Sequence, residues 1–351
     1  MIKVGIYGGT GYMGGEVLRI LLGHPQVEVA WITSRSGGNL AFYHPNLYGI
    51  EVNIVQPEEA PTCDIVFLAL PTGESIQYAR RCLEKGSKVI DLGAAFRLQN
   101  REVWEAIYNQ PHTAWELVQE AVYGVTELHM EKIKSARLIA NPGCFSSAAI
   151  LGLSPLVKAK LIKLDSITVD GLSGTTGAGA ELSRAIHHPE IANNLVPYNA
   201  VNHRHTYEME QELSILAGEP VTVNFTPVYV PIVRGILDIC HTYYQTPITR
   251  QEVLSIYRDF YKNEPFVRVY DLPKEENASW QYRPYPWVSS VAGTNYCFIG
   301  LDIDEKRKRV VVFSVLDSIG KGGAQVGVEN MNLILGLDRR AGLVNLGLHP
   351  G

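Results

Sequence analysis

One of the five cysteines of this chain has neighbours that suit covalent chemistry. Cys144 follows an apolar run, Leu138–Ala140, and the turn Asn141-Pro142-Gly143, and a helical pattern continues over Phe145–Leu156. This order places Cys144 at a helix N-terminus, where unpaired N–H groups and the helix dipole stabilise a thiolate and an oxyanion. A thiolate converts an acyl phosphate into a thioester that a hydride can reduce. The other cysteines lie in apolar patterns and are expected to be structural: Cys63, Cys82, Cys240 and Cys297.

A glycine-rich turn joins a strand predicted at Ile2–Tyr7 to a helix predicted at Gly14–Leu22. Glycines let the backbone approach a pyrophosphate closely, and the first N–H groups of a helix attract its phosphates. The pattern therefore predicts a dinucleotide-binding loop. Its expected cofactor-binding residues are Gly8, Thr10, Gly11, Tyr12, Met13 and Gly14.

The end of the next predicted strand, Val27–Ile32, indicates which dinucleotide binds. NAD-preferring sites place an acidic residue about 20 residues after the loop to bond the ribose 2′-hydroxyl. Here the strand is followed by Thr33-Ser34-Arg35-Ser36, which has no carboxylate. A guanidinium flanked by hydroxyl groups suits a 2′-phosphate, so Ser34, Arg35 and Ser36 favour NADP. A solvated loop arginine is the alternative.

Two histidines, His203 and His205, are followed by Glu208 three residues after the second. If a helix begins at Thr206, the carboxylate of Glu208 is placed to hydrogen-bond an imidazole and fix its tautomer. One histidine is expected to act as general acid and base, and we favour His205 over His203. Zinc binding by the His-x-His pair and two plain surface histidines are the alternatives.

The elements that must position these residues fall into two groups. Strand and helix patterns alternate through the first half of the chain, which predicts a parallel sheet wound through right-handed crossovers. Longer β-type runs mixed with helices follow from about residue 166, which is typical of an α+β domain with a mostly antiparallel sheet. We therefore expect a Rossmann-type, doubly wound α/β domain at residues 1–143 and 318–351, and a substrate and dimerisation domain at residues 144–317.

Three further stretches carry specific predictions. Helical patterns are expected at Ala180–Ile186 and Arg250–Tyr261 in the second domain. The helical segment Gly322–Leu335 is rich in small residues on one face and is expected to pack on the first domain.

Composition excludes several classes of protein. The chain has 351 residues, of which 46% are apolar and 19% charged, with a net charge of −5, as in a globular protein of about two domains. It has no polybasic run, no apolar stretch of membrane-spanning length and no leader-peptide pattern, so we expect a cytoplasmic protein that binds neither nucleic acid nor membranes. The cysteines have no C-x-x-C spacing, which argues against disulfides and a zinc ribbon.

Four motifs together resemble the N-acetyl-γ-glutamyl-phosphate reductase family, and the resemblance spans nearly the whole chain. They are Gly8-Gly9-Thr10-Gly11-Tyr12, Asn141–Phe145, Ser173–Gly179 and His203-Arg204-His205-Thr206. The resemblance implies a relation to aspartate-semialdehyde dehydrogenases. It also implies NADPH-dependent reduction of N-acetyl-glutamyl 5-phosphate to the semialdehyde, with release of inorganic phosphate, in arginine biosynthesis. A homodimer or homotetramer formed through the sheet of the second domain is implied as well.

The resemblance adds residues to the expected site. It implies that Gly174, Gly177 and Ser318 lie on the cofactor side. Arginines suit carboxylates and phosphates because they bind them in a bidentate manner, although surface ion pairs are the alternative for each. The expected substrate-binding residues are Arg97, Asn141, Arg204 and Arg234. Which arginine binds which anion stays open.

Several positions depart from the family pattern. Gly93 and Ala95 stand where the family has Ser and Asp, Ser318 stands where it has Asn, and Ala180 replaces a basic residue. Arg184, four residues along the expected helix, is placed to substitute for that cation.

The segment Ile186–Glu190 resembles the related reductase of lysine biosynthesis, whose aminoadipyl phosphate is carried on a small acidic protein. That carrier-linked substrate is our second hypothesis. Two hypotheses of other kinds are hydride transfer without a covalent intermediate and a non-catalytic NADP-binding redox sensor with Cys144 as the oxidised residue. A sensor needs neither paired histidines nor substrate arginines.

Overall fold

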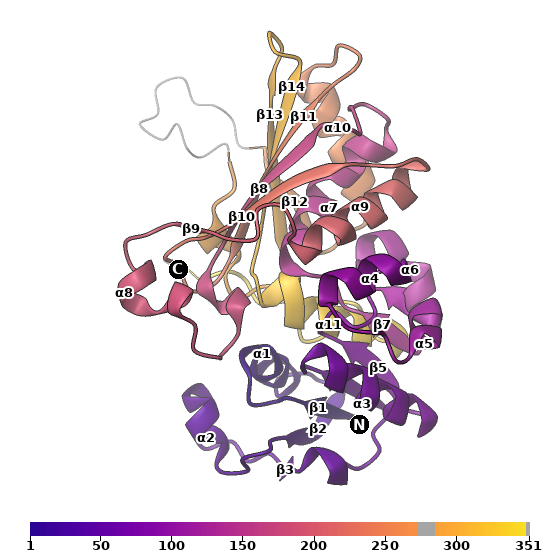
Figure 1. Cartoon of the computed structure of the whole chain (residues 1–351), viewed down its shortest axis with the longest axis vertical. Coiled ribbons are helices and arrows are strands. Elements are labelled where there is room, and N and C mark those ends of the chain that lie inside the picture. The colour runs from indigo at the N-terminus through magenta and orange to yellow at the C-terminus, as the bar shows by residue number, and fades with distance from the viewer. Residues whose placement is uncertain (272–284, 349–351) are drawn as a thin grey trace. The chain divides into compact units, whose positions relative to one another are not determined.

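The computed structural model describes residues 1–271 and 285–348, which form two compact units (Figure 1). Unit 1 consists of residues 1–142 and 323–345, and unit 2 consists of residues 143–322 and the residues from 346 onward. Each unit contains its own seven-stranded sheet. The domain ranges predicted from the sequence also include residues 272–284 and 349–351, which lie outside the described residues.

The sheet of unit 1 has the strand order β3-β2-β1-β4-β5-β7-β6, and every pairing among its described strands is parallel. Its central strand β4 (Ile65–Leu68) is buried throughout, because a parallel sheet is covered on both faces. The predicted doubly wound α/β fold is therefore confirmed. The other strands are β1 (Ile2–Tyr7), β2 (Val27–Thr33), β3 (Ile54–Val55), β5 (Lys88–Asp91), β6 (Val122–Tyr123) and β7 (Leu138–Ala140).

The helices of unit 1 include one from the far end of the sequence. All residues of α11 (Gln325–Ile334) are buried. Gln325 donates to Glu16 Oε1 of α1 (3.1 Å), and Asn332 lies 3.0 Å from His24 Nε2, so this segment packs where its sequence pattern predicts. The other helices are α1 (Tyr12–Leu21), α2 (Leu40–Tyr43), α3 (Thr72–Glu84), α4 (Arg101–Tyr108), α5 (Trp115–Glu120) and α6 (Thr126–Ser135).

The sheet of unit 2 is mixed, with the order β12-β13-β14-β11-β8-β10-β9. Among its described strands, the pairs β12/β13 and β8/β10 are parallel and the other four pairs are antiparallel, so the predicted mostly antiparallel sheet is confirmed. The strands are β8 (Ile167–Ser173), β9 (Val196–Pro197), β10 (Val223–Tyr229), β11 (Ile236–Tyr243), β12 (Val267–Val269), β13 (Cys297–Asp304) and β14 (Arg309–Leu316).

Helices cover one face of this second sheet (Figure 1). Along β8 and β11, fully buried residues alternate with partly exposed ones, as expected when only one face of a sheet is covered. Within residues 1–271 and 285–348, no helix is long and apolar enough to cross a membrane. The helices of unit 2 are α7 (Cys144–Lys158), α8 (His188–Ile191), α9 (Arg204–Ala217) and α10 (Arg250–Tyr261).

The predicted helix at Ala180–Ile186 is wrong. This stretch contains only the short 3₁₀ turn Arg184–Ile186, because Gly179 adopts φ +87° just before it and Leu182 is fully exposed, which leaves no apolar face to bury. Arg184 pairs with Glu190 at 3.4 Å. The helical spacing on which its expected role as a substitute cation for Ala180 rested is therefore absent from this stretch.

Candidate active site

Cys144 is the first residue of α7, as its sequence context predicts. Gly143 is the N-cap residue, and the Cys144 side chain is half-buried. A Cβ added at Gly322 would lie 2.8 Å from Cys144 Cβ, so only a glycine lets that loop approach the cysteine so closely. The thiol therefore lies where the unpaired N–H groups of the first helical turn converge.

Glu208 of α9 connects this helix to the start of α7. Its carboxylate is fully buried, and Oε2 accepts a hydrogen bond of 3.0 Å from the backbone N–H of Gly143. Oε1 lies 3.9 Å from His205 Nε2. The same carboxylate thus fixes the residue before Cys144 and lies beside the imidazole that sequence reasoning favoured.

The two histidines differ in their surroundings. The helix begins at Arg204 rather than at the predicted Thr206, because His203 caps it: His203 Nδ1 accepts a 3.2 Å bond from the N–H of His205. Burial and the nearby Arg204 lower the pKa of His203 to about 4, although Glu208 opposes this shift. The His205 ring lies against Gly143, where an added Cβ would overlap Nε2. His203 is therefore a neutral capping residue, and His205 adjoins the residue before the cysteine.

Aromatic side chains pack around these two histidines. The ring of Phe145 lies 5.8 Å from His203 and 5.9 Å from His205. Tyr198 lies 5.5 Å from the His203 ring and stacks on Tyr229, with 4.2 Å between ring centroids. Burial raises the pKa of both tyrosines, and the negative charge of a nearby Cys144 thiolate adds to this rise.

Sequence reasoning missed both tyrosines. Tyr229 ends a strand and Tyr198 follows one, and no spacing in a single sequence indicates that β9 and β10 pair. Arg204 is exposed at the start of α9, and its charge opposes the rise in pKa at Tyr198 and Tyr229. The expected substrate arginine and the two tyrosines therefore belong to the same electrostatic neighbourhood.

Arg234 forms an ion pair within unit 2. Its Nε donates to both oxygens of the buried Asp317 carboxylate, at 2.9 and 3.2 Å. Asp317 also accepts bonds of 3.0 Å from the backbone N–H groups of Ile319 and Gly320. For Arg234, the structure therefore shows the ion pair that stood as the alternative to substrate binding.

The loops that carry the other expected cofactor-side residues of unit 2 meet at Ser318. Its hydroxyl lies 3.1 Å from Thr176 Oγ1 and accepts a 3.1 Å bond from the N–H of Gly235. A Cβ at Gly174 would lie 2.8 Å from the carbonyl oxygen of Val233, whereas Gly177 is exposed. Three motifs that are distant in sequence thus form one corner of unit 2.

The glycine loop of unit 1 packs closely against α1 and is open on one side. Gly8 adopts φ +72°, and its N–H donates to Thr33 Oγ1 at 3.0 Å. A Cβ at Gly14 would overlap the carbonyl oxygen of Gly8, so helix and loop pack closely there. A Cβ at Gly11 would meet only Gly8 O, at 3.7 Å, among the described residues, which leaves that side of the loop open. Tyr12 and Met13 begin α1, and Thr10 lies in the loop before it; all three side chains are partly or largely exposed.

Arg35 forms an ion pair with Glu74 of α3. Its side chain is 70% exposed, whereas Ser34 is buried and Ser36 is exposed. A bound 2′-phosphate would therefore compete with the Glu74 carboxylate for this guanidinium.

Arg97 and Asn141 lie inside unit 1 and are almost fully buried. Arg97 Nη2 donates to the carbonyl oxygen of Leu92 at 3.1 Å, and Asn141 Nδ2 donates to that of Gly323 at 2.9 Å. The buried Asp91 is also close to Arg97, whose charge lowers its pKa while burial raises it more strongly. Both expected substrate residues thus make contacts that organise the loops of unit 1.

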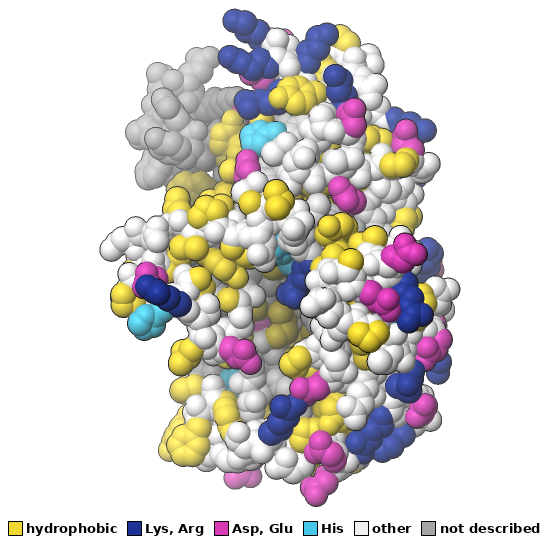
Figure 2. Space-filling view, in the orientation of Figure 1, with side chains coloured by type: hydrophobic (Ala, Val, Ile, Leu, Met, Phe, Trp, Pro, Cys, Tyr) yellow, Lys and Arg dark blue, Asp and Glu magenta, His cyan; other side chains and the backbone are white. Residues whose placement is uncertain are grey.

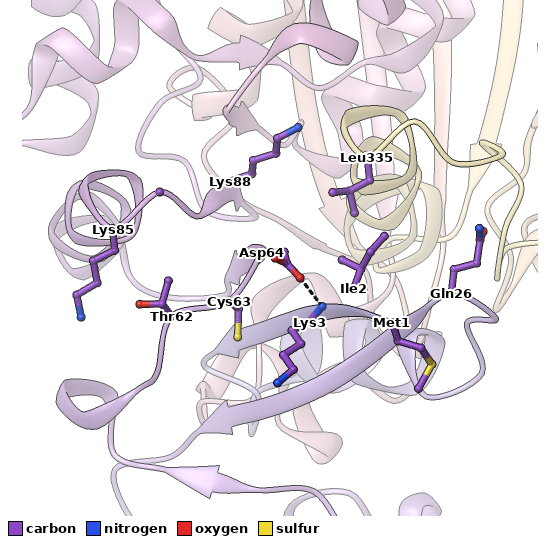
Figure 3. Close-up of a pocket in the computed structure, with 11 residues that line it drawn as sticks. Met1, Ile2, Lys3, Gln26, Thr62, Cys63, Asp64, Lys85, Lys88 and Leu335 are labelled. Carbon is purple, nitrogen blue, oxygen red and sulfur yellow. Dashed lines mark hydrogen bonds between the residues drawn. The ribbon is translucent and has the colours of Figure 1, made fainter.

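A cavity of about 860 Å³ lies at a different place in unit 1. It opens where β1, β4 and β5 begin, and Figure 3 shows Lys3, Lys85 and Lys88 directed away from one another around it. Ligands of doubly wound sheets bind at the opposite, carboxyl ends of the strands, where the glycine loop lies. The cavity contains none of the expected site residues. Among the described residues, no cluster of three or more His, Cys, Asp or Glu side chains is arranged to hold a metal ion.

The fold and these side chains define a class of protein in which a dinucleotide-binding unit is joined to a unit with a cysteine at a helix N-terminus. Residues 3–136 match the family model "Semialdehyde dehydrogenase, NAD binding domain", and residues 144–318 match "Semialdehyde dehydrogenase, dimerisation domain". The fold is similar to that of aspartate semialdehyde dehydrogenase II of Vibrio cholerae in complex with ASA, with a TM-score of 0.69 and 19% identity over 95% of this chain and 98% of that one. It also resembles the fold of aspartate semialdehyde dehydrogenase with NADP from Candida albicans. The TM-score is 0.66, and the identity is 17% over 97% of this chain and 99% of that one.

Relatives with higher identity narrow this class. N-acetyl-gamma-glutamyl-phosphate reductase of Pelotomaculum thermopropionicum is 44% identical over 357 residues, which cover 99% of both chains. That of Desulforamulus reducens is 41% identical over 356 residues and 100% of both chains. A Thermomicrobium roseum protein provisionally named LysW-L-2-aminoadipate 6-phosphate reductase is 43% identical over 357 residues, 100% of this chain and 99% of that one. This chain belongs to the N-acetyl-gamma-glutamyl-phosphate reductase family of the semialdehyde dehydrogenases.

Proposed function

We propose that this protein reduces N-acetyl-L-glutamyl 5-phosphate to N-acetyl-L-glutamate 5-semialdehyde with NADPH and releases inorganic phosphate, as a step of arginine biosynthesis. The observation that carries the proposal is the group at the start of α7, where Glu208 holds Gly143 and His205 lies against it. The names of the relatives, at 41% and 44% identity over nearly whole chains, support the same reaction.

In the first half-reaction, the Cys144 thiolate attacks the acyl carbon. The bond between this carbon and the phosphate oxygen breaks, and inorganic phosphate leaves with the bonding electrons. The oxyanion that forms during the attack is stabilised by the N–H groups of the first turn of α7. The product is a thioester on Cys144.

In the second half-reaction, a dinucleotide held by the glycine loop of unit 1 would supply the hydride that reduces the thioester. His205 protonates the resulting hemithioacetal oxygen, and it takes this proton back as the carbon–sulfur bond breaks. This step releases the aldehyde and restores the thiolate. We assign the proton transfers to His205 because His203 Nδ1 is already used to cap α9. Glu208 positions both the thiol and the imidazole.

Unit 1 has the features that a nicotinamide dinucleotide requires. The first turn of α1 and the glycine loop would hold the pyrophosphate, while Ser34, Arg35 and Ser36 would hold the 2′-phosphate of NADPH. We infer that the cofactor belongs to the domain predicted at residues 1–143 and 318–351, and thiol chemistry to that at 144–317. Gly174, Gly177 and Ser318 are proposed to face the cofactor.

Substrate anions are proposed to meet arginines. Arg204 is the candidate favoured by its exposed position and by its electrostatic effect on Tyr198 and Tyr229. Arg97, Asn141 and Arg234 already have partners in the structure, so a substrate role would require these contacts to be shared. The carrier-linked aminoadipyl phosphate is the second candidate substrate, because the Thermomicrobium roseum relative is 43% identical.

We further propose that the protein is a homo-oligomer, and residues 144–318 match a family model described as a dimerisation domain. The face of the unit 2 sheet opposite its helices is the proposed interface. Its partly exposed apolar residues include Leu172, Leu237, Ile239, Val311 and Phe313. Exposed apolar side chains also gather around β9 and β10 in Figure 2.

The assay runs the reaction backwards. Purified protein is given NADP⁺, inorganic phosphate and either N-acetyl-glutamate semialdehyde or the carrier-linked aminoadipate semialdehyde, and NADPH formation is followed. Phosphate-dependent activity with the first aldehyde is the expected result. A preference for the second assigns the protein to lysine synthesis. Absence of turnover with both, despite NADPH binding, refutes acyl-phosphate reduction and favours the redox sensor.

A further inference from the structure

Two neighbouring side chains at the end of α2 contact two separate loops of unit 1. The hydroxyl of Tyr43 donates to the carbonyl oxygen of Gly37 at 2.6 Å. His44 Nε2 lies 2.7 Å from the carbonyl oxygen of Gly9. Gly9 belongs to the glycine loop, and Gly37 follows the Ser34–Ser36 segment. Two adjacent residues therefore hold both loops of the proposed cofactor site. One is the glycine loop, assigned to the pyrophosphate, and the other is the loop after β2, assigned to the 2′-phosphate.

Tyr43 closes the loop after β2. Gly37 and Gly38 adopt φ +61° and +98°, so the chain turns sharply there. The Ser34 hydroxyl lies 3.4 Å from the Tyr43 oxygen and 3.5 Å from Gly37 O, and Ser34 itself is buried. Tyr43 thus fixes the backbone that presents Arg35 and its neighbouring hydroxyl groups.

His44 fixes one peptide of the glycine loop. Its ring is buried, and a Cβ added at Gly15 would overlap the imidazole, which explains why a glycine stands at that position of α1. Because the carbonyl oxygen of Gly9 accepts this bond, Nε2 must carry the proton. The C=O and N–H groups of a trans peptide point in opposite directions. The hydrogen bond from His44 to Gly9 O therefore also sets the direction of the Thr10 N–H. In the proposed site, this N–H donates a hydrogen bond to the pyrophosphate.

We propose that Tyr43 and His44 form a strap, the Tyr43–His44 strap, that positions the two halves of the dinucleotide site. Tyr43 positions the 2′-phosphate loop, and His44 positions the pyrophosphate loop. Both act through the backbone and are positioning residues. The inference rests on the proposed use of NADPH.

The two residues should affect cofactor affinity in different ways. Tyr43→Phe removes the hydroxyl that holds Gly37, so we expect the dissociation constant for NADPH to rise about fivefold and that for NADH, which lacks the 2′-phosphate, to stay within about twofold. His44→Leu removes the donor to Gly9 and should weaken both dinucleotides about tenfold, with their ratio unchanged. His44→Gln retains an N–H donor and should recover most of this loss.

The test is a fluorescence titration of the purified full chain with NADPH and, separately, NADH. Tyr48→Phe is the matched control, because Tyr48 is 86% exposed on the same segment. Gly15→Ala places a methyl group where the His44 imidazole lies and so disturbs the same contact from α1. This variant tests the role of His44 if circular dichroism shows that His44→Leu fails to fold. It should also weaken both dinucleotides equally.

The strap is refuted if Tyr43→Phe weakens NADPH and NADH equally, or if either His44→Leu or Gly15→Ala leaves both affinities unchanged. A wild-type protein that binds NADH more tightly than NADPH refutes the proposed cofactor instead. In that case the His44 arm still tests whether the strap positions the pyrophosphate loop.

Discussion

At the scale of single residues, the chemistry depends on Cys144. We expect Cys144→Ser to lower kcat at least about a thousandfold while NADPH affinity stays within about twofold, because a hydroxyl at its ordinary pKa is a far weaker nucleophile than a thiolate. Steady-state rates and dinucleotide titration measure the two effects. Cys63→Ala serves as the control, because Cys63 is buried and its thiol pKa is raised to about 11. Activity that survives in Cys144→Ser would establish hydride transfer without a thioester.

His203 supplies a pH-dependent prediction. Its folded pKa of about 4 lies below the ordinary value of 6.5, so the folded protein disfavours the protonated ring. The resulting stability is complete above pH 6.5 and is lost as the pH falls towards 4, at a cost of about 3 kcal/mol. His203→Asn, which retains a capping oxygen, should lose less free energy of unfolding between pH 7 and pH 4 than the wild type. Denaturant unfolding at both pH values measures this difference, and equal losses would contradict the assignment.

At the scale of elements, α3 is expected to weaken NADPH binding, because its Glu74 carboxylate pairs with Arg35. Glu74→Gln removes a carboxylate that competes with the 2′-phosphate for Arg35, so we expect about threefold tighter NADPH binding and unchanged NADH binding. The effect should shrink at high salt because the ion pair is exposed. Isothermal titration measures it, with Glu84→Gln on the exposed face of the same helix as the control. Equal changes for both dinucleotides would show that Arg35 does not bind the 2′-phosphate.

The elements also show how far a single sequence could predict this structure. β1 ends at Tyr7, where its apolar run ends, because burial in a parallel sheet requires those residues. The predicted start of α9 at Thr206 is wrong, because the helix is capped by the imidazole of His203 and begins at Arg204. The stacking of Tyr198 on Tyr229 depends on the pairing of β9 with β10, which no local pattern encodes. Glu208 was expected beside an imidazole, but its bond to Gly143 N–H joins residues 65 positions apart.

At the scale of the whole molecule, the sheet face of unit 2 opposite its helices is the proposed interface between copies of the chain. We expect Ile239→Lys to convert the proposed oligomer into a monomer, because removing the added charge from water at an apolar interface is costly. Light scattering after size-exclusion chromatography measures the mass. Ile215→Lys is the control, because Ile215 is 51% exposed on α9, and it should leave the mass unchanged. An Ile239→Lys protein of wild-type mass would place the interface elsewhere.

The path of the chain through unit 1 has a consequence for biosynthesis. A ribosome completes β1 through β7 early, but the wholly buried α11 emerges only after residues 143–322 have been made. Until then, the surfaces of α1 and α6 that α11 covers remain exposed to water. Unit 2 is contiguous through residue 322 and is free to fold first, whereas unit 1 must wait for its last helix. Translation speed and chaperone binding therefore matter most for the cofactor-binding half, although it is the half that begins the chain.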